Sequence, residues 1–207
     1  MKSYIHLIRH GLTEGNTKRW FYGATDVPLL EEGVEDLAKL RKEGIYPVFE
    51  EADFYTSGML RTKQTLETIY GPVPFRIIDD LREMNFGRWE CKTFEELKME
   101  PEAEEWMKEN NVTFCYPGGG ESQVGFRSRV HDGLHTLLNF HAMLEVSQKA
   151  TDKDANTVAV CHGGVISAIL HQLFPEEKHS FWDWIPDPGH GYTVELKNGK
   201  AVSWKAF

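Results

Sequence analysis

Residues 7–16 read Leu-Ile-Arg-His-Gly-Leu-Thr-Glu-Gly-Asn, and they continue an apolar run that begins at Tyr4. An apolar run that stops at a polar turn indicates a buried strand. Arg9 and His10 then stand at the carboxyl end of that strand, followed by the flexible Gly11. Because ligands of open α/β sheets bind at this edge, the stretch predicts a site that holds a cation and a titratable side chain.

The composition argues against several classes of protein. The 207 residues are 41% hydrophobic and 27% charged, which is enough for one full core. A net charge of −9 argues against a nucleic-acid surface. No apolar run approaches the roughly 18 residues of a membrane span, and we identify no signal peptide. The 3 cysteines form no CxxC pair, so we expect a reducing cytoplasm, no metal and no cofactor.

Strand and helix patterns alternate along the chain. Apolar runs predict strands at 3–9, 52–57, 75–78 and 157–161. Amphipathic spacing predicts helices at 29–42, 58–70, 122–149 and 165–173. Asn198-Gly199 separates two alternating runs within 192–204, which predicts a hairpin. We therefore expect an α/β fold, a three-layer αβα sandwich whose mostly parallel sheet ends in an antiparallel C-terminal edge hairpin.

The alternation is interrupted between residues 80 and 120. This part is aromatic and acidic, with short helices predicted at 94–99 and 101–109 and a loop at 117–122. We interpret it as an insertion-like cap over the sheet edge. Because no linker divides the chain, we expect one domain over residues 1–207.

Two predicted strands end in the same His-Gly pair, at 10–11 and 162–163. If these strands are neighbours in a parallel sheet, both imidazoles face one pocket. A third strand is followed within one helical turn by Arg61. Two guanidinium groups, those of Arg9 and Arg61, suit phosphate because their planar forks match several equivalent oxygens. The spacing therefore predicts that these four side chains converge on one small anion.

The stretch 7–16 resembles the signature of the histidine phosphatase superfamily, which includes cofactor-dependent phosphoglycerate mutases. The resemblance covers about the whole chain in sequence order. Further matching blocks lie at 23–29, 55–65, 81–90, 117–122 with Arg129, and 162–164. The chain departs from the family pattern at Gly58, where proline is usual, and at Cys91, where glycine is common.

The resemblance implies a role for each residue of this group. His10 would attack phosphorus as a neutral imidazole and form a phosphohistidine. Arg9, Arg61 and His162 would hold the phosphoryl oxygens and stabilise the transition state. Glu83 would protonate the leaving alkoxide and then activate water. No metal is implied, because the arginines supply the positive charge. The residues implied to bind substrate or phosphate are Arg9, Asn16, Tyr22, Gly23, Arg61 and Gly163.

Several residues keep a structural alternative. The structural alternative for His10 is that of a capping or core histidine. For Arg9 and Arg61 it is a bridge between helices. Other candidate acids are Glu90, Glu95 and Glu96. The aromatic residues that either contact a leaving group or only pack are Trp20, Phe21, Tyr22 and Trp106. We expect packing or surface roles for His6, His131, His135, His141, His171, His179 and His190, and among them we single out His190, which precedes the hairpin, as the candidate to face the site. Cys161 is interpreted as a buried small hydrophobe.

We expect a phosphomonoester hydrolase that acts on a small phosphorylated metabolite through phosphohistidine, as a monomer or homodimer. Residues 90–109 contain eight Glu and three Lys, and the resulting repulsion of a multiply anionic glycerate argues against the alternative, a phosphoglycerate mutase. Segment 83–90, with Trp106 and 117–122, is similar to alpha-ribazole phosphatases of cobalamin synthesis, which implies alpha-ribazole 5'-phosphate as substrate. A non-catalytic phosphoryl-binding module is the third alternative, although such a module is expected to lack the histidine or the acid.

Overall fold

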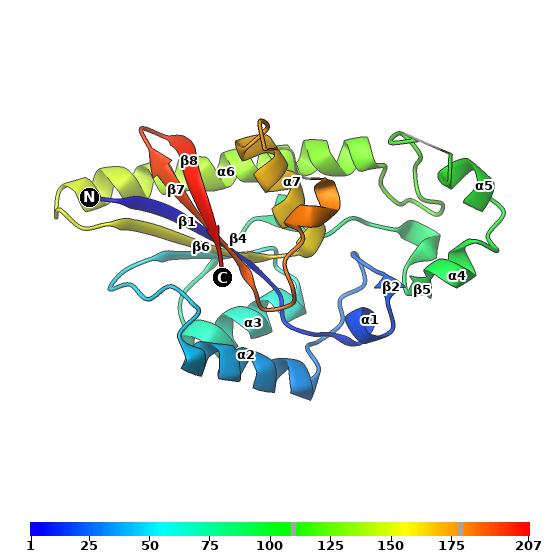
Figure 1. Ribbon diagram of the computed structural model, residues 1–207, viewed down its shortest axis with the longest axis horizontal. Helices are drawn as coiled ribbons and strands as arrows, with labels where there is room; N and C mark the ends of the chain where they lie inside the picture. Colours follow the sequence, from blue (N-terminus) through cyan, green and yellow to red (C-terminus); the bar gives the residue numbers. More distant parts are fainter. Residues whose placement is uncertain (109–110, 178–179) are drawn as a thin grey trace.

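A central sheet organises the computed structural model, which describes residues 1–108, 111–177 and 180–207. Its strands lie in the order β4-β3-β6-β1-β7-β8 (Figure 1). Their bounds are β1 (Ser3–Arg9), β3 (Asp53–Thr56), β4 (Arg76–Ile77), β6 (Ala155–Cys161), β7 (Gly191–Lys197) and β8 (Lys200–Ala206). The first four are parallel, and β7 and β8 add an antiparallel pair beside β1. The predicted mostly parallel sheet with a C-terminal hairpin is confirmed.

The two strands that end in His-Gly are neighbours. β1 and β6 pair in parallel, with Arg9 opposite Cys161. The pairing continues one step further, because the His10 N–H donates to the Cys161 carbonyl at 3.0 Å. Ile5, Leu7 and Ile8 are almost fully buried, as expected for a strand at the centre of a parallel sheet. The register therefore brings His10 and His162 to the same sheet edge, as the sequence predicts.

Helices cover both faces of the sheet (Figure 1). On one face, α2 (Glu31–Glu43) and α3 (Leu60–Tyr70) pack with a buried cluster that includes Ile8, Leu37, Leu66, Val158 and Val160. On the other face, α6 (Gln123–Lys149) and α7 (Gly163–Leu173) pack with a cluster that includes Leu7, Phe126, Leu134, Ala159 and Ile169. Alternate residues of the central strands thus serve the two layers, which confirms the αβα sandwich.

The cap lies beyond the carboxyl ends of β1 and β6 (Figure 1). Its elements are two 3-10 turns, η1 (Asp79–Leu81) and η2 (Gly87–Trp89), β5 (Lys92–Thr93), α4 (Phe94–Leu97) and α5 (Ala103–Trp106). The segment after β1, which contains α1 (Glu14–Thr17) and β2 (Trp20–Phe21), lies beside it. β2 pairs with β5 in a small separate sheet. Trp89, Leu97 and Tyr116 form a buried cluster of their own, against which Phe21, Phe86, Trp106 and Phe114 pack. The aromatic composition of this region therefore builds a local core.

The boundaries differ from the sequence-based ones where backbone geometry or distant pairing intervenes. Helix α3 begins at Leu60 and not at 58, because Gly58 has a φ of +84° and Met59 is extended. A φ of +84° excludes proline, the residue usual in the family at that place. Cys91 also has a positive φ, +61°, a conformation that explains why glycine is common there. The predicted helix 101–109 is reduced to α5, and position 109 lies outside the described residues.

Candidate active site

A cavity of about 470 Å³ opens at the carboxyl end of β1. The predicted site residues that line it are Arg9, His10, Asn16, Tyr22, Glu83 and Gly163. Three others, Arg61, His162 and Gly23, lie behind this wall, and the side chains of Arg61 and His162 are 0% exposed. The structure therefore arranges the predicted residues in two layers, one that faces the cavity and one that supports it.

His10 is held as a neutral imidazole in which one ring nitrogen has no hydrogen-bond partner among the described residues. Its Nδ1 contacts the Gly11 carbonyl at 2.8 Å, and because a carbonyl only accepts, Nδ1 carries the proton. Burial lowers the pKa of His10 well below its usual value of 6.5, and the charges of Arg61 and Arg9 lower it further. The His10 side chain is 3% exposed, and its ring centre lies 5.3 Å from that of His162. The lone pair of Nε2 is therefore available for attack at phosphorus.

Arg9 presents an unused donor beside His10. Its Nη1 donates to the Pro186 carbonyl at 2.7 Å, whereas Nε is buried and has no partner within the described part of the chain. A buried donor without an acceptor costs free energy. This Nε is closed off from the cavity, so an anion there would meet the part of the Arg9 side chain that lines the cavity. A Cβ on Gly163 would lie 3.3 Å from this Nε and 2.9 Å from Ile185 Cγ2. The glycine thus lets the start of α7 approach the guanidinium.

Arg61 is fixed by three partners behind the cavity. Its Nε donates to His162 Nδ1 at 3.3 Å, and its Nη1 and Nη2 donate to the carbonyls of Thr25 and Gly23, both at 2.9 Å. Because His162 Nδ1 accepts, Nε2 carries the proton and donates to Ser57 Oγ at 2.8 Å. Burial, with the charge of Arg61, lowers the pKa of His162. Both ring nitrogens of His162 thus have protein partners, and a phosphoryl oxygen would have to replace Ser57 to bind Nε2.

Glu83 is the candidate acid that lines the cavity. Its Oε2 accepts from the Gly164 N–H and its Oε1 from the Met84 N–H, both at 3.0 Å. A Cβ on Gly164 would lie 2.6 Å from Oε1, so only glycine allows this approach. The first turn of α7 also favours negative charge. The other candidate acids, Glu90, Glu95 and Glu96, do not line the cavity.

A chain of hydrogen bonds fixes the wall beside Arg61. Asn16 Oδ1 accepts from the Thr13 N–H at 3.0 Å and from Thr13 Oγ1 at 2.9 Å. Since Thr13 uses its hydroxyl proton there, the Tyr22 hydroxyl donates to Thr13 Oγ1 at 2.6 Å. The Arg61 guanidinium lies 5.2 Å from the centre of the Tyr22 ring. Asn16 consequently retains its NH₂ group as the donor for a bound molecule.

The outer wall of the cavity is aromatic and was only partly predicted. The aromatic residues there are Trp20, Phe21, Tyr22, Phe86, Tyr116, Phe126, Phe181 and Trp182. Trp20, Phe21 and Tyr22 therefore lie where a leaving group would be. Trp106 instead packs against Trp89, with 5.2 Å between the ring centres. Sequence reasoning missed Phe181 and Trp182 in η3 (Phe181–Trp184), although this aromatic cluster directly before the hairpin was a visible signal. It also missed Arg19, Gln123 and Arg127 on the same wall.

The expected repulsion by an acidic cap does not operate at the cavity. Among the described residues that line it, Glu83 is the only carboxylate. The glutamates of the cap are engaged elsewhere. Glu100 and Glu102 pair with Lys92 and Arg88, and Glu96 caps α4. The argument from the eight glutamates was therefore wrong for those that the structure describes, because none of them lines the cavity.

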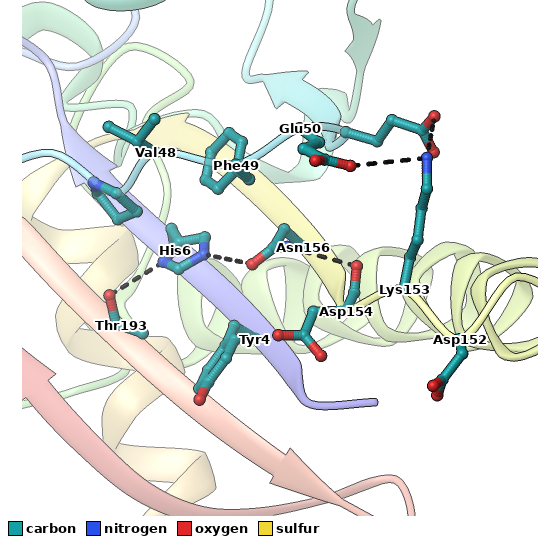
Figure 2. A pocket seen from close by; sticks show the side chains of 12 residues that line it. Tyr4, His6, Val48, Phe49, Glu50, Asp152, Lys153, Asp154, Asn156 and Thr193 are labelled. Atoms are coloured by element: carbon teal, nitrogen blue, oxygen red, sulfur yellow. Dashed lines mark hydrogen bonds and ion pairs between the residues drawn. The ribbon is translucent and has the colours of Figure 1, made fainter.

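A second hollow, of about 570 Å³, lies at the opposite end of β1 (Figure 2). Figure 2 shows His6 there between Thr193 and Asn156, to which its ring nitrogens bond at 2.9 and 3.3 Å. The lysine that lines this hollow, Lys153, forms an ion pair with Glu51, with 2.9 Å between Nζ and Oε1. The other carboxylates on the rim are Glu50, Asp152 and Asp154. This charge opposes phosphate, so we place the site in the smaller cavity.

The remaining predicted residues have structural roles. His190 Nδ1 bonds to the Phe207 carbonyl at 3.0 Å and does not line the cavity, so it has a packing role and the alternative, that it faces the site, does not hold. Cys161 is 0% exposed, and burial raises the pKa of its thiol. His6 and His141 are buried, and His131 and His135 are exposed on α6. His171 stacks on Phe181. His179 lies outside the described residues.

The described residues also bear on metal binding and on membrane insertion. Over residues 1–108, 111–177 and 180–207, no group of three or more His, Cys, Asp or Glu side chains is placed to hold a metal ion. Within the same ranges, no helix combines the length and apolar character needed to cross a bilayer.

Comparisons with known proteins identify the family of this chain. The family model for the histidine phosphatase superfamily (branch 1) matches residues 5–205. The "Adenosylcobalamin/alpha-ribazole phosphatase" of Escherichia coli (strain K12) is 26% identical over 93% of this chain and 89% of its own length. "Probable phosphoglycerate mutase GpmB" of Yersinia pestis (strain Pestoides F) is 27% identical over 85% of this chain and 77% of its own. A crystal structure from Escherichia coli K-12 superposes with a TM-score of 0.80 at 23% identity, over 100% of this chain and 96% of that chain, which supports the fold. The match of the family model along almost the whole chain, on a site of this geometry, establishes that the chain belongs to the histidine phosphatase superfamily.

Proposed function

We propose that this member of the superfamily hydrolyses phosphomonoesters through a phosphohistidine on His10. The observation that carries the proposal is that His10 and Arg9 line the same cavity. The neutral imidazole of His10 keeps the lone pair of Nε2, and the guanidinium of Arg9 supplies positive charge beside it. A phosphoryl group in the cavity would suit both, because phosphorus accepts the lone pair and the guanidinium stabilises the charge on the phosphoryl oxygens.

The two half-reactions follow from the positions of His10 and Glu83. In the first, His10 Nε2 attacks phosphorus, the bond from phosphorus to the ester oxygen breaks, and protonated Glu83 gives its proton to that oxygen. In the second, Glu83 takes a proton from water, the water oxygen attacks phosphorus, and the bond to Nε2 breaks. Inorganic phosphate leaves and His10 regains its lone pair. Arg9, with Arg61 and His162 behind it, would stabilise the charge that develops on the phosphoryl oxygens.

The leaving group that we propose is an alcohol that carries a flat ring. The outer wall offers Trp20, Phe86, Tyr116, Phe181 and Trp182, together with other aromatic side chains. Aromatic rings favour stacked or edge-to-face contact with another ring. A volume of about 470 Å³ also exceeds what a glycerate would fill, and a loosely filled cavity would admit the water that hydrolysis requires.

Alpha-ribazole 5'-phosphate is our candidate for the physiological substrate. It carries a benzimidazole ring on its ribose, which matches the aromatic wall. The Escherichia coli relative bears the name of that activity, at 26% identity. We further propose that the reaction takes place in a reducing cytoplasm, on the ground that Cys91, Cys115 and Cys161 are all free thiols.

Phosphoglycerate mutase activity is the second candidate. It is favoured by the name of the Yersinia pestis relative and by Arg19 and Arg127, two cavity-lining cations that suit a carboxylate. Both activities would use the same phosphohistidine. The difference lies in whether water or the bound glycerate accepts the phosphoryl group. The third alternative, a non-catalytic binding module, is disfavoured because His10 and Glu83 are both present and both line the cavity.

A panel of phosphomonoesters tests the proposal. Alpha-ribazole 5'-phosphate, phenyl phosphate, 3-phosphoglycerate and 2-phosphoglycerate are each incubated with the protein, and inorganic phosphate and the isomeric glycerate are measured separately. We expect phosphate release, with the highest kcat/KM on the ring-bearing esters. Interconversion of the two phosphoglycerates without phosphate release would support the mutase instead.

A further inference from the structure

The Glu90 carboxylate is surrounded by backbone donors. The N–H groups of Gly23, Ala24 and Thr25 donate to it at 3.0 Å, and that of Phe86 donates at 2.9 Å. Three consecutive N–H groups that point at one anion form the kind of concave anion site that often binds phosphate. In this chain the protein fills that site with its own side chain. The Gly23 N–H is therefore not a phosphate ligand, although the sequence implied that Gly23 is.

The same loop holds Arg61 from its other side. The carbonyls of Gly23 and Thr25 accept from the two Nη atoms of Arg61 at 2.9 Å. These two residues thus donate to Glu90 with their N–H groups and accept from Arg61 with their carbonyls. Arg61 is 0% exposed, so no solvent offers a replacement. The position of the Glu90 carboxylate consequently determines where the Arg61 guanidinium lies.

Glu90 also ties this loop to the segment that carries the acid. Phe86, one of its four donors, lies three residues after Glu83 in the same segment. The two segments touch, since a Cβ on Gly23 would lie 1.8 Å from the Met84 carbonyl oxygen. One carboxylate therefore joins the loop that holds the phosphate clamp to the segment that presents the general acid.

We propose that Glu90 is a positioning residue that fixes the Glu83 carboxyl relative to the Arg61 guanidinium, and that it acts without contact to substrate. The inference rests on the proposed hydrolase function for the roles of Arg61 and Glu83. A carboxylate suits the position because it offers only acceptors to four donors. A glutamine would turn an NH₂ group toward at least one of these N–H groups, which would push the two segments apart.

The test compares Glu90→Gln with wild type on two esters of similar shape, phenyl phosphate and p-nitrophenyl phosphate. Phenolate is the poorer leaving group and needs the acid more. We expect kcat/KM, which reports the step that forms the phosphohistidine, to fall by about 100-fold on phenyl phosphate and by about tenfold on p-nitrophenyl phosphate, because misplacement of the acid adds to misplacement of the clamp. Glu96→Gln is the matched control, since Glu96 also accepts a backbone N–H in the cap but has no contact with the 23–25 loop.

Orthovanadate binding, measured by calorimetry, reports on the clamp independently of turnover. We expect an affinity about tenfold weaker in Glu90→Gln than in wild type, and a smaller loss in Glu90→Asp, which keeps the charge and is the variant to compare if Glu90→Gln does not fold. Equal losses of kcat/KM on the two esters, or unchanged vanadate affinity in a folded variant, would overturn the inference. If wild type binds vanadate but hydrolyses neither ester, the proposed function fails, and the vanadate comparison still decides whether Glu90 positions Arg61.

Discussion

Arg61 Nε donates to His162 Nδ1 at 3.3 Å, which joins the first turn of α3 to the residue that precedes α7. Both side chains are fully buried. The contact requires a neutral imidazole, because a protonated His162 would turn an N–H toward the guanidinium. The guanidinium that we propose as a phosphate clamp is thus oriented by a histidine that burial keeps uncharged.

Replacement of Arg61 by lysine keeps the charge but removes the fork. A lysine ammonium does not reach Thr25, Gly23 and His162 simultaneously with the planar geometry of a guanidinium. We expect kcat/KM for phenyl phosphate to fall by about 10²- to 10³-fold, the usual loss when a transition-state donor is removed. Arg82→Lys is the control, since Arg82 is half exposed and pairs with Asp79. Retention of wild-type kcat/KM by the Arg61 variant would show that Arg61 is no clamp.

Gly164→Ala tests the approach of Glu83 to α7. The new Cβ would lie 2.6 Å from Glu83 Oε1, so the carboxyl must move. We expect a loss of about 10²-fold in kcat/KM on phenyl phosphate and a smaller loss on p-nitrophenyl phosphate, because a good leaving group needs less proton donation. Gly125→Ala, in α6, is the control, since its Cβ would meet nothing closer than 3.4 Å. Equal effects of the two alanines would contradict the role of Glu83.

Trp182→Ala tests the aromatic wall. Trp182 is 73% exposed and lines the cavity mouth. Loss of one ring contact is expected to lower kcat/KM for phenyl phosphate by about tenfold, which corresponds to about 1.4 kcal/mol, and to leave that for ethyl phosphate nearly unchanged. Met143→Ala, an exposed residue of α6 far from the lining, controls for surface truncation. A parallel loss on both esters would mean that the wall does not select the leaving group.

The sheet and its edge were predictable because their signals are local. The continuous apolar runs before His10 and His162 indicated two central strands, and parallel pairing of these strands was enough to predict that both histidines lie at one sheet edge. Arg61 was predicted at the same edge because it follows a third strand within one helical turn. The expectation of one domain over residues 1–207 stays a prediction.

Other parts of the site depend on partners far apart in the sequence. β2 is two residues long and exists because it pairs with β5. From the sequence, Glu90 was only one of several candidate acids. Its role was hidden because three of its four backbone donors lie 65 to 67 positions away in the 23–25 loop. Phe181 and Trp182 reach the cavity only through the fold of η3. Periodicity contains none of this information.

Acid should destabilise the fold through His6. Burial lowers the pKa of His6 from 6.5 to about 4, so between these values the unfolded chain takes up a proton that the folded chain does not. The stabilisation is complete above pH 6.5 and decreases as the pH falls toward 4. From pH 7 to pH 5 we expect His6 to account for a loss of about 2 kcal/mol in the free energy of unfolding by urea. His6→Gln should remove that part of the pH dependence, and His135→Gln, at an exposed site on α6, should not.

Direct detection of the phosphorylated residue tests the central claim. The protein is mixed with p-nitrophenyl phosphate, quenched in alkali within the first turnovers because phosphohistidine survives base and not acid, and digested for mass spectrometry. The Glu83→Gln variant, in which hydrolysis of the intermediate should be slowed more than its formation from this ester, is analysed in parallel. The account predicts a phosphoryl group on His10 in both proteins, with a larger fraction in the variant. Phosphate release without any phosphoryl group on His10, or with the group on another residue, would contradict it.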